Sequence, residues 1–329
     1  MEKFDIVSIG DSTIDVFMQV ESRDTEAVCK LHEEECMICF AYGSKIPVST
    51  CVRIAAVGNA ANNAIGSTRL GLKTAIYTVL GSDQDSKDTK EVFETEGVSS
   101  NFIVLESGKK SNFSTVINYS GERTIFVYHE QHSYDLPEFE SDWIYLTSVG
   151  AEHTKLHDQV IEHTTKKGTK LAFNPGSHQL RDGLENLKPL LAKTDILSVN
   201  REEAHSLVGG DKEDIKGLIS AFSQTGVKLV LITDGPEGSY ASYDGREVWQ
   251  VGIPAEAPIM ERTGAGDAYS TGFVAALVKG KELPEAMVWG TINATSVIAY
   301  IGAREGLLTP MQITEWIKKY GEQIKPRMI

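Results

Sequence analysis

Short apolar runs that end at polar residues or glycine recur along the chain, and they predict buried strands. The first covers residues 4–10, and later ones are DWIYLTSVG, TKLAFNPG, TDILSVN and VKLVLITDG. A helix-like segment precedes or follows each later run, which favours a mostly parallel sheet between layers of helices. Ligands of such sheets bind at the carboxyl ends of the strands. We therefore expect the chemistry along a rim that contains Asn174, Asn200, Asp234 and Gly235.

Other patterns predict the remaining elements. TIDVFMQV alternates like a strand, and helical spacing marks GNAANNAIGSTRLGL, which ends at Gly71, and residues of about 85–96, 267–280 and 284–301. SNFSTVINY and RTIFVYH form one predicted hairpin, and SYASYDGREVWQV forms another that turns at Asp244 and Gly245. Residues 21–56 lack clear periodicity. We expect a single domain over residues 1–329, with a small β lid from about 15–56 and 113–128.

Charge narrows the class of partner. The chain of 329 residues has 32 Lys plus Arg against 46 Asp plus Glu, a formal net charge of −14. This balance disfavours binding to nucleic acid or to an anionic membrane. No stretch offers the ~20 apolar residues of a membrane span, and the start carries no apolar leader. We expect a soluble cytoplasmic protein that acts on a small molecule.

The four cysteines all fall in one short window of the chain. Cys36 and Cys39 have the spacing of one arm of a zinc site, and Cys29, His32 or Cys51 are candidates to complete it. A matching second pair is missing, however, and the surrounding residues read as partly buried apolar packing. We therefore favour reduced cysteines that act as small hydrophobes over structural zinc.

The segment ERTGAGDAYSTGF, residues 261–273, carries the clearest chemical signal. Gly264 and Gly266 let the backbone turn tightly and approach a ligand. Ala, Phe, Val and Leu then recur at helical spacing, so the turn lies at a helix N-terminus, where free N–H groups and the helix dipole favour an anion. A transferring phosphoryl group is the natural anion, with Asp267 placed to accept a proton from an attacking hydroxyl.

A simpler interpretation of Asp267 also exists. An acid in the first turn of a helix complements the helix dipole, which is worth about 0.3–1 kcal/mol. Short glycine motifs are weak evidence taken alone. The rest of the chain decides between the two interpretations.

RTGAGDAYSTGF resembles the C-terminal signature of the ribokinase-like (PfkB-type) carbohydrate kinase family. VGNAANNAIGSTRLGLKTAIYTVLGSDQDS is similar to its N-terminal signature, and GDSTIDV, NYSGERTI, NREE, TDGPEGS and NATSVIAYIGA follow in family order. The resemblance spans about the whole chain. It implies a three-layer αβα ribokinase-like fold, and a kinase that uses ATP and Mg²⁺ to phosphorylate a hydroxyl.

The resemblance assigns roles on the nucleotide side. Asp267 would be the general base, and the N–H groups of Gly264, Ala265 and Gly266 would hold the γ-phosphate. Asn200 and Glu203 match the pair that organises Mg²⁺ and phosphates, largely through water, and one carboxylate suffices for such an ion. Further matches to nucleotide-binding positions are Thr233, Gly235, Gly238 and Asn293. Without the resemblance, NREE would read as a strand end followed by a solvated acidic helix start.

On the acceptor side, Asp15 matches the family's substrate-binding acid, whose carboxylate can accept hydrogen bonds from two neighbouring hydroxyls. Gly58, Asn59 and Asn62 match the positions where a sugar approaches a helix start. Arg123 matches a polar residue of the lid hairpin that reaches the ligand. A solvated turn is the alternative for Arg123.

Three departures from the family pattern stand out. Val57 and Gly58 replace a pair of glycines. Glu261 stands where an acid usually opens the second signature, and Arg262 follows it where a Thr is common. Because that acid lies near the family's monovalent-cation site, potassium dependence stays open. The excursion of residues 21–56 is longer than in compact members, and a larger lid, a homodimer contact or a small metal-stapled flap are its alternatives.

Three functions remain open from the sequence. The first is a sugar kinase of the ribokinase or fructokinase kind, and the second is a nucleoside kinase in which Phe17, Phe40, Tyr42 or Phe126 clamps the base. A sugar-phosphate acceptor would need cations such as Lys45, Arg53 and Arg123. The third is a sensor of sugars or nucleotides without catalysis. A dinucleotide-dependent dehydrogenase is disfavoured, because VSIGDSTID lacks the required glycine turn.

Overall fold

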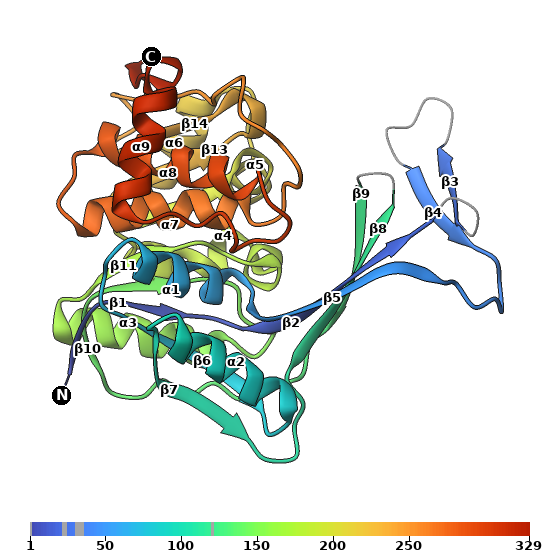
Figure 1. Ribbon diagram of the computed structural model, residues 1–329. Helices are drawn as coiled ribbons and strands as arrows, with labels where there is room; N and C mark the ends of the chain where they lie inside the picture. The colour runs from blue at the N-terminus through green and yellow to red at the C-terminus, as the bar shows by residue number, and fades with distance from the viewer. Residues whose placement is uncertain (1, 22–24, 30–35, 120–121) are drawn as a thin grey trace.

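The fold was analysed in a computed structural model, which describes residues 2–21, 25–29, 36–119 and 122–329. Figure 1 shows a body of helices and strands from which a second, smaller set of strands projects to one side. The body contains a ten-stranded sheet, and the projection contains a four-stranded sheet and a separate two-stranded hairpin.

The larger sheet is parallel over most of its width. In spatial order its strands are β16 (Arg327–Met328), β15 (Trp249–Val251), β14 (Ser239–Ser242), β13 (Leu229–Thr233), β12 (Ile196–Asn200), β11 (Lys170–Phe173), β10 (Glu140–Leu146), β1 (Lys3–Ile9), β6 (Thr74–Gly81) and β7 (Ser99–Glu106). The strands from β13 to β7 pair in parallel, and β14, β15 and β16 add an antiparallel edge. The near-continuous burial of β1, β6 and β10 fits a sheet covered on both faces.

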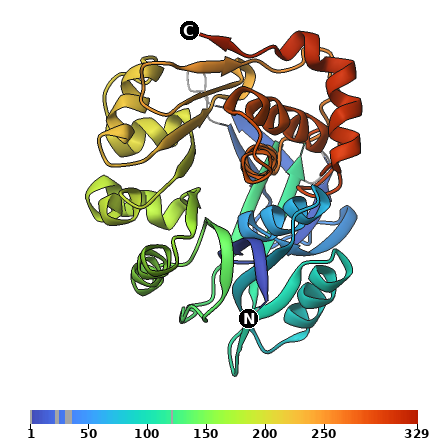
Figure 2. The same ribbon diagram turned by 90° about the vertical axis from the view of Figure 1, so that its left-hand side faces the viewer.

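Helices cover both faces of this sheet, as Figure 2 shows along its edge. One face carries α3 (Thr154–Lys167), α4 (Ser177–Leu191), α5 (Arg201–Val208) and α6 (Ile215–Ser223). The other face carries α1 (Asn59–Arg69), α2 (Gln84–Thr95), α7 (Ala265–Val278), α8 (Leu283–Val297) and α9 (Pro310–Tyr320). Two short 3₁₀ turns, η1 (Gly235–Glu237) and η2 (Gly321–Ile324), complete the body. The expected three-layer αβα arrangement is confirmed.

The small sheet has the order β5 (Val48–Val57), β2 (Thr13–Val20), β8 (Asn112–Tyr119) and β9 (Glu122–Tyr128). β2 pairs in parallel with β8, whereas β5 and β9 pair antiparallel to their neighbours. Within the excursion, β3 (Thr25–Cys29) and β4 (Cys36–Phe40) form the separate hairpin at the far end of the projection (Figure 1). The predicted strand TIDVFMQV and the β8–β9 hairpin are confirmed, and β5 is a strand at the end of the excursion that was not predicted as one.

Helix ends follow local chemistry and explain where the sequence prediction was inaccurate. α1 ends before Gly71, which has a positive φ of 81°, as predicted. α8, by contrast, ends at Val297 rather than near residue 301. The chain turns after Ile298, and Gly302 has a φ of 88° that glycine adopts readily, so the apolar run continues into a loop.

The expected packing of the cysteine segment is only partly present. Cys51 is exposed and Cys39 is half-buried, both as free thiols, and Met37 and Phe40 on β4 are exposed. The side chains of Cys29 and Cys36 and the whole of His32 lie outside the described residues. The prediction that the segment packs as a partly buried cluster is therefore wrong for Cys51, because β5 projects away from the body core. The preference for free thiols over zinc stays a prediction.

Candidate active site

The turn before α7 has the geometry that its glycines predicted. Gly264 adopts a φ of 75° at the N-cap position of α7. A Cβ there would lie 2.4 Å from the Ala303 Cβ, so a side chain is excluded by both conformation and space. Gly266 has open space around it, and it is exposed in the first turn of the helix. The helix start therefore faces a region that a ligand can reach, and of its N–H groups that of Ala265 makes a long bond of 3.4 Å to the Arg262 carbonyl oxygen.

Asp267 occupies the first turn of α7, where α1 meets it. The Asn62 Nδ2 donates a hydrogen bond of 2.8 Å to the Asp267 Oδ2 across a sequence separation of 205 residues. Burial raises the pKa of the Asp267 carboxyl to about 6, the bond from Asn62 opposes this rise, and the negative charge of Glu203 adds to it. A carboxylate with a raised pKa is a stronger base than an ordinary aspartate, which suits proton abstraction.

Asn200 and Glu203 stand at the carboxyl end of β12 and the start of α5. Their backbone N–H groups and side chains bond reciprocally, with distances of 2.8 Å from Glu203 N to Asn200 Oδ1 and 2.9 Å from Asn200 N to Glu203 Oε2. This capping box accounts locally for the Asn-x-x-Glu spacing. Burial raises the pKa of Glu203. The negative charge of Glu203 in turn raises the pKa of Asp267, so Glu203 adds negative potential near Asp267.

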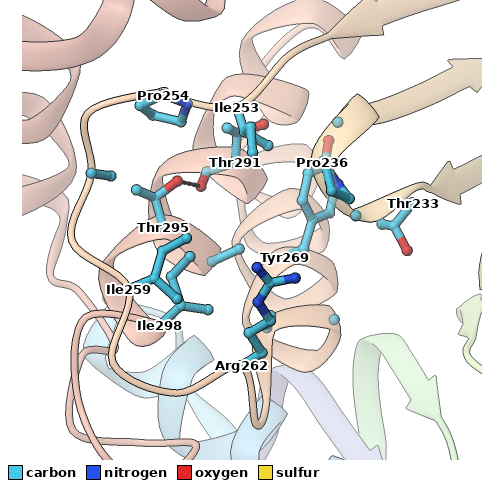
Figure 3. Close-up of a pocket in the computed structure, with 16 residues that line it drawn as sticks. Thr233, Pro236, Ile253, Pro254, Ile259, Arg262, Tyr269, Thr291, Thr295 and Ile298 are labelled. Carbon is cyan, nitrogen blue, oxygen red and sulfur yellow. Dashed lines mark hydrogen bonds between the residues drawn. The ribbon is translucent and has the colours of Figure 1, made fainter. Parts of the chain in front are cut away.

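A cavity of about 280 Å³ lies beside the start of α7 (Figure 3). Its lining includes five residues expected from the sequence, namely Thr233, Gly235, Gly238, Ala265 and Gly266. The remainder is largely apolar and comes from η1, from the segment after β15, and from α7 and α8 with its C-cap: Pro236, Ile253, Pro254, Ala257, Ile259, Arg262, Tyr269, Thr291, Ala294, Thr295 and Ile298. An apolar cavity that ends at an anion-binding helix start suits a molecule with a flat ring and a phosphate chain.

Gly238 is fixed by space as well as by conformation. Its φ is 89°, and a Cβ would lie 2.0 Å from the Val251 carbonyl oxygen. Only glycine therefore allows the 3₁₀ turn after β13 to approach β15 and form one wall of the cavity.

Asp15 lies on β2 of the small sheet, opposite Ile54 on β5 and Ser114 on β8. Burial raises the pKa of the Asp15 carboxyl to about 6, while a hydrogen bond with Ser114 and the charge of Arg304 oppose the rise, and the charge of Glu261 adds to it. Asp15 therefore lies within electrostatic range of the motif that precedes α7. The structure brings the small sheet and the anion turn to one region.

The start of α1 supplies the other expected acceptor residues. Gly58 is the N-cap of α1 with a φ of 102°, and its Cβ would lie 2.9 Å from the Asp11 carbonyl oxygen. Asn59 is the first residue of the helix and is half-buried. Asn62 is buried, and its Oδ1 has no hydrogen-bond partner among the described residues. This buried acceptor belongs to the same amide that donates to Asp267.

Asn293 and Arg123 are expected site residues whose side chains lie apart from the groups described above. Asn293 is fully buried in α8, where its Nδ2 donates to the Ala268 carbonyl at 2.7 Å and its Oδ1 accepts from the Leu308 N–H at 3.1 Å. Both ends of the amide are therefore used within the core, and the structure lends no support to nucleotide binding by Asn293. Arg123 lies on β9 opposite Asn118 with an exposed side chain, away from the residues that line the cavity.

Tyr134 and Asp11 form a hydrogen-bonded pair near the carboxyl end of β1 that the sequence analysis missed. The Tyr134 hydroxyl donates to Asp11 at 2.8 Å and accepts from the Gly150 N–H at 2.8 Å. Burial raises the pKa of Asp11 to about 6.

The sequence analysis also missed the apolar lining that residues 253–259 give to the cavity. The one indication of this lining in the sequence was its position directly before the glycine motif.

Comparison with known proteins agrees with this geometry. Residues 3–310 match the pfkB family of carbohydrate kinases, and the chain belongs to that family. A sugar kinase of Archaeoglobus fulgidus is 30% identical over 254 residues, which are 74% of this chain and 98% of that protein.

Solved structures share the fold. The Arabidopsis thaliana ribokinase, solved with ribose and ATP, aligns with a TM-score of 0.78 at 22% identity over 96% of this chain and 99% of its own. The Methanocaldococcus jannaschii nucleoside kinase aligns with a TM-score of 0.76 at 20% identity over 97% of this chain and 99% of its own. The protein is thus a member of the pfkB carbohydrate kinase family with a ribokinase-like fold.

The two raised carboxyl pKa values predict a particular pH dependence. Both Asp15 and Asp267 have folded-state pKa values of about 6, and the roles expected from the sequence, acceptor binding for Asp15 and proton acceptance for Asp267, require both carboxyls to be ionised. We expect log kcat/KM for an accepted sugar to fall below pH 6 with a slope approaching two, and log kcat with a slope near one, because bound hydroxyls keep Asp15 ionised. Initial rates at saturating ATP from pH 5 to 8 measure this. Constant kcat/KM down to pH 5 would contradict both assignments.

Proposed function

We propose that this protein is an ATP-dependent kinase that transfers the γ-phosphate to a hydroxyl of a small sugar, with Asp267 as general base. The observation that carries the proposal is the Asp267 carboxyl, which has a raised pKa, lies in the first turn of α7 and is bonded to Asn62. A residue that only complemented the helix dipole would need neither the burial nor this bond.

The cavity beside α7 receives ATP, with its base among the apolar residues and its phosphates at the start of α7. The N–H groups of Gly264, Ala265 and Gly266 bind the γ-phosphate and stabilise its charge in the transition state. The acceptor oxygen bonds to the γ-phosphorus as the bond to the leaving oxygen of ADP breaks. The hydroxyl proton passes to the Asp267 carboxylate.

Asn200 and Glu203 fit a water-mediated Mg²⁺ site. The pKa of Glu203 is raised by burial, and its charge raises the pKa of Asp267, so a bound cation would offset the repulsion between these carboxylates. Mg²⁺ keeps several waters and needs few protein ligands. When bound, it neutralises charge on the nucleotide phosphates.

The acceptor lies between α1 and the small sheet, which acts as a lid on a single domain of residues 1–329. Asp15 accepts hydrogen bonds from two sugar hydroxyls, and Gly58, Asn59 and Asn62 provide the close backbone approach and the amides on the other side. Arg123 on β9 would reach this site only if the lid moved toward the body.

A sugar fits this site better than a nucleoside. Phe17 is buried within the small sheet, whereas Phe40, Tyr42 and Phe126 are exposed, so the four aromatic candidates do not form one clamp. Carboxylates and amides instead surround the proposed acceptor position. A nucleoside kinase on the same fold is the alternative, and exposed Phe126 on the lid is the feature that would serve it.

An acceptor screen tests the proposal. We expect sugars to stimulate ADP release from ATP and Mg²⁺ at least tenfold over the acceptor-free rate, with nucleosides giving less, since the site offers hydroxyl acceptors rather than a ring clamp. Coupled ADP detection with a panel of pentoses, hexoses, sugar phosphates and nucleosides measures this. A preference for adenosine would favour the alternative, and no stimulation by any acceptor would favour a non-catalytic sensor.

We also propose that two copies associate through the lid. β9 is an edge strand of the small sheet, and its run Ile125, Phe126, Val127 and Tyr128 is exposed at 44%, 60%, 54% and 47%. A strand that is apolar on both faces and open at its edge is an association site. An identical strand from a second copy can pair with it about a two-fold axis.

This association predicts a dimer that Phe126→Glu weakens. We expect the wild-type mass in sedimentation equilibrium to be twice the chain mass, and a dissociation constant at least tenfold higher for Phe126→Glu, because a charge would be buried at the contact. Tyr243→Glu is the control, since Tyr243 is an aromatic residue exposed on the body. A monomeric wild type would refute the proposal.

A further inference from the structure

Arg262 is the one charged side chain among the described residues that line the cavity beside α7. It precedes the glycine turn by two positions, and its side chain is exposed. Figure 3 shows the guanidinium pointing into the cavity on the side of Tyr269, between the apolar lining and the start of α7. The sequence marked this position as a departure from the family pattern, where a Thr is common.

No acidic side chain among the described residues neutralises Arg262, and its guanidinium makes no hydrogen bond within them. The neighbouring Glu261 is already engaged, because its carboxylate accepts hydrogen bonds from the Thr263 hydroxyl and from the Gly302 N–H. The charge of Arg262 is therefore open to an anionic ligand that enters the cavity.

Arg201 provides the contrast at the same rim of the sheet. Its guanidinium bonds to Asp234 and to Glu213, at 2.8 Å for Glu213, so its charge is neutralised within the protein. The positive charge of Arg201 therefore serves contacts within the protein, whereas the positive charge of Arg262 is available to a ligand.

The surroundings of Arg262 identify the ligand as a polyanion. Ala265 and Gly266, whose N–H groups belong to the helix start, line the same cavity. A guanidinium and a helix N-terminus together match the oxygens of a phosphate chain, because arginine donates two parallel hydrogen bonds to such groups.

We propose that Arg262 binds the polyphosphate of the donor nucleotide and neutralises charge on it during transfer, a role that rests on the proposed kinase function. Arg262 then supplies from the protein a positive charge that the anion turn alone lacks. It touches the nucleotide and not the acceptor, so it governs affinity for the donor's phosphates rather than the choice of sugar.

Nucleotide binding without turnover tests this role. Calorimetry would compare ADP, AMP and adenosine, each with Mg²⁺, on the wild type, Arg262→Thr and Arg262→Lys. For Arg262→Thr we expect ADP affinity to fall about 10- to 100-fold and adenosine affinity to change less than about twofold, because a charge-assisted hydrogen bond acts on phosphate alone. Arg262→Lys should give an intermediate loss, since it keeps the charge without the planar fork.

Arg246→Thr is the matched control, because Arg246 is exposed in the β14–β15 loop and does not line the cavity. Its ADP affinity should equal that of the wild type. Unchanged ADP affinity in Arg262→Thr would overturn the inference while leaving the kinase proposal intact. An equal loss for adenosine would show that Arg262 stacks on the base instead, which also overturns it. A wild type that binds no ADP would overturn the nucleotide site itself.

Discussion

The contact between α1 and α7 is the constraint on which the site depends. It holds Asn62 against Asp267 and Asn63 against Thr271, and the Ser8 hydroxyl on β1 bonds to Asn63 at 2.7 Å. The helices approach closely because Gly66 faces Thr271, where a Cβ would lie 2.7 Å from the methyl group. Two glycine-rich segments that are distant in sequence thereby become one site, and Asp267 is fixed at a desolvated position rather than left on the surface.

Desolvation and like charge then set the chemistry of the rim. Asp11, Asp15 and Asp267 all have pKa values raised to about 6, chiefly because burial disfavours their charged forms. Concentrating acids in this way destabilises the folded protein above pH 6, and such a cost is typical of functional sites. The positive elements near these acids include the helix start at Gly264, the guanidinium of Arg262 and, beside Asp15, the charge of Arg304. In the proposed function, the donor phosphates lie on the positive side of this region and the acceptor hydroxyls on the acidic side.

The sequence predicted the layers, the rim and the glycine turn because these follow from local patterns. Apolar runs ending at Asn200 and Thr233 define strands, and Gly264 is required by a backbone that tolerates no Cβ. It could not predict the use of Asn293, since an amide in a helix looks the same whether it faces a ligand or caps core backbone groups. The apolar wall of the cavity could not be predicted from the sequence either, because residues 253–259 lie in a loop without periodicity and meet α8 only through the tertiary fold.

The most direct test of the account is Asp267→Asn, which keeps the shape of the side chain and the contact with Asn62. The account predicts a fall in kcat of about 10²- to 10⁴-fold with ADP affinity within twofold of the wild type, because the amide cannot accept the proton. It also predicts a variant more stable than the wild type by about 1–3 kcal/mol at pH 8 but not near pH 4, since the penalty of ionising Asp267 builds up as pH rises from its ordinary pKa of 3.8 to its folded pKa of about 6 and is fully present above that. Turnover within tenfold of the wild type would contradict the assignment of Asp267 as the base.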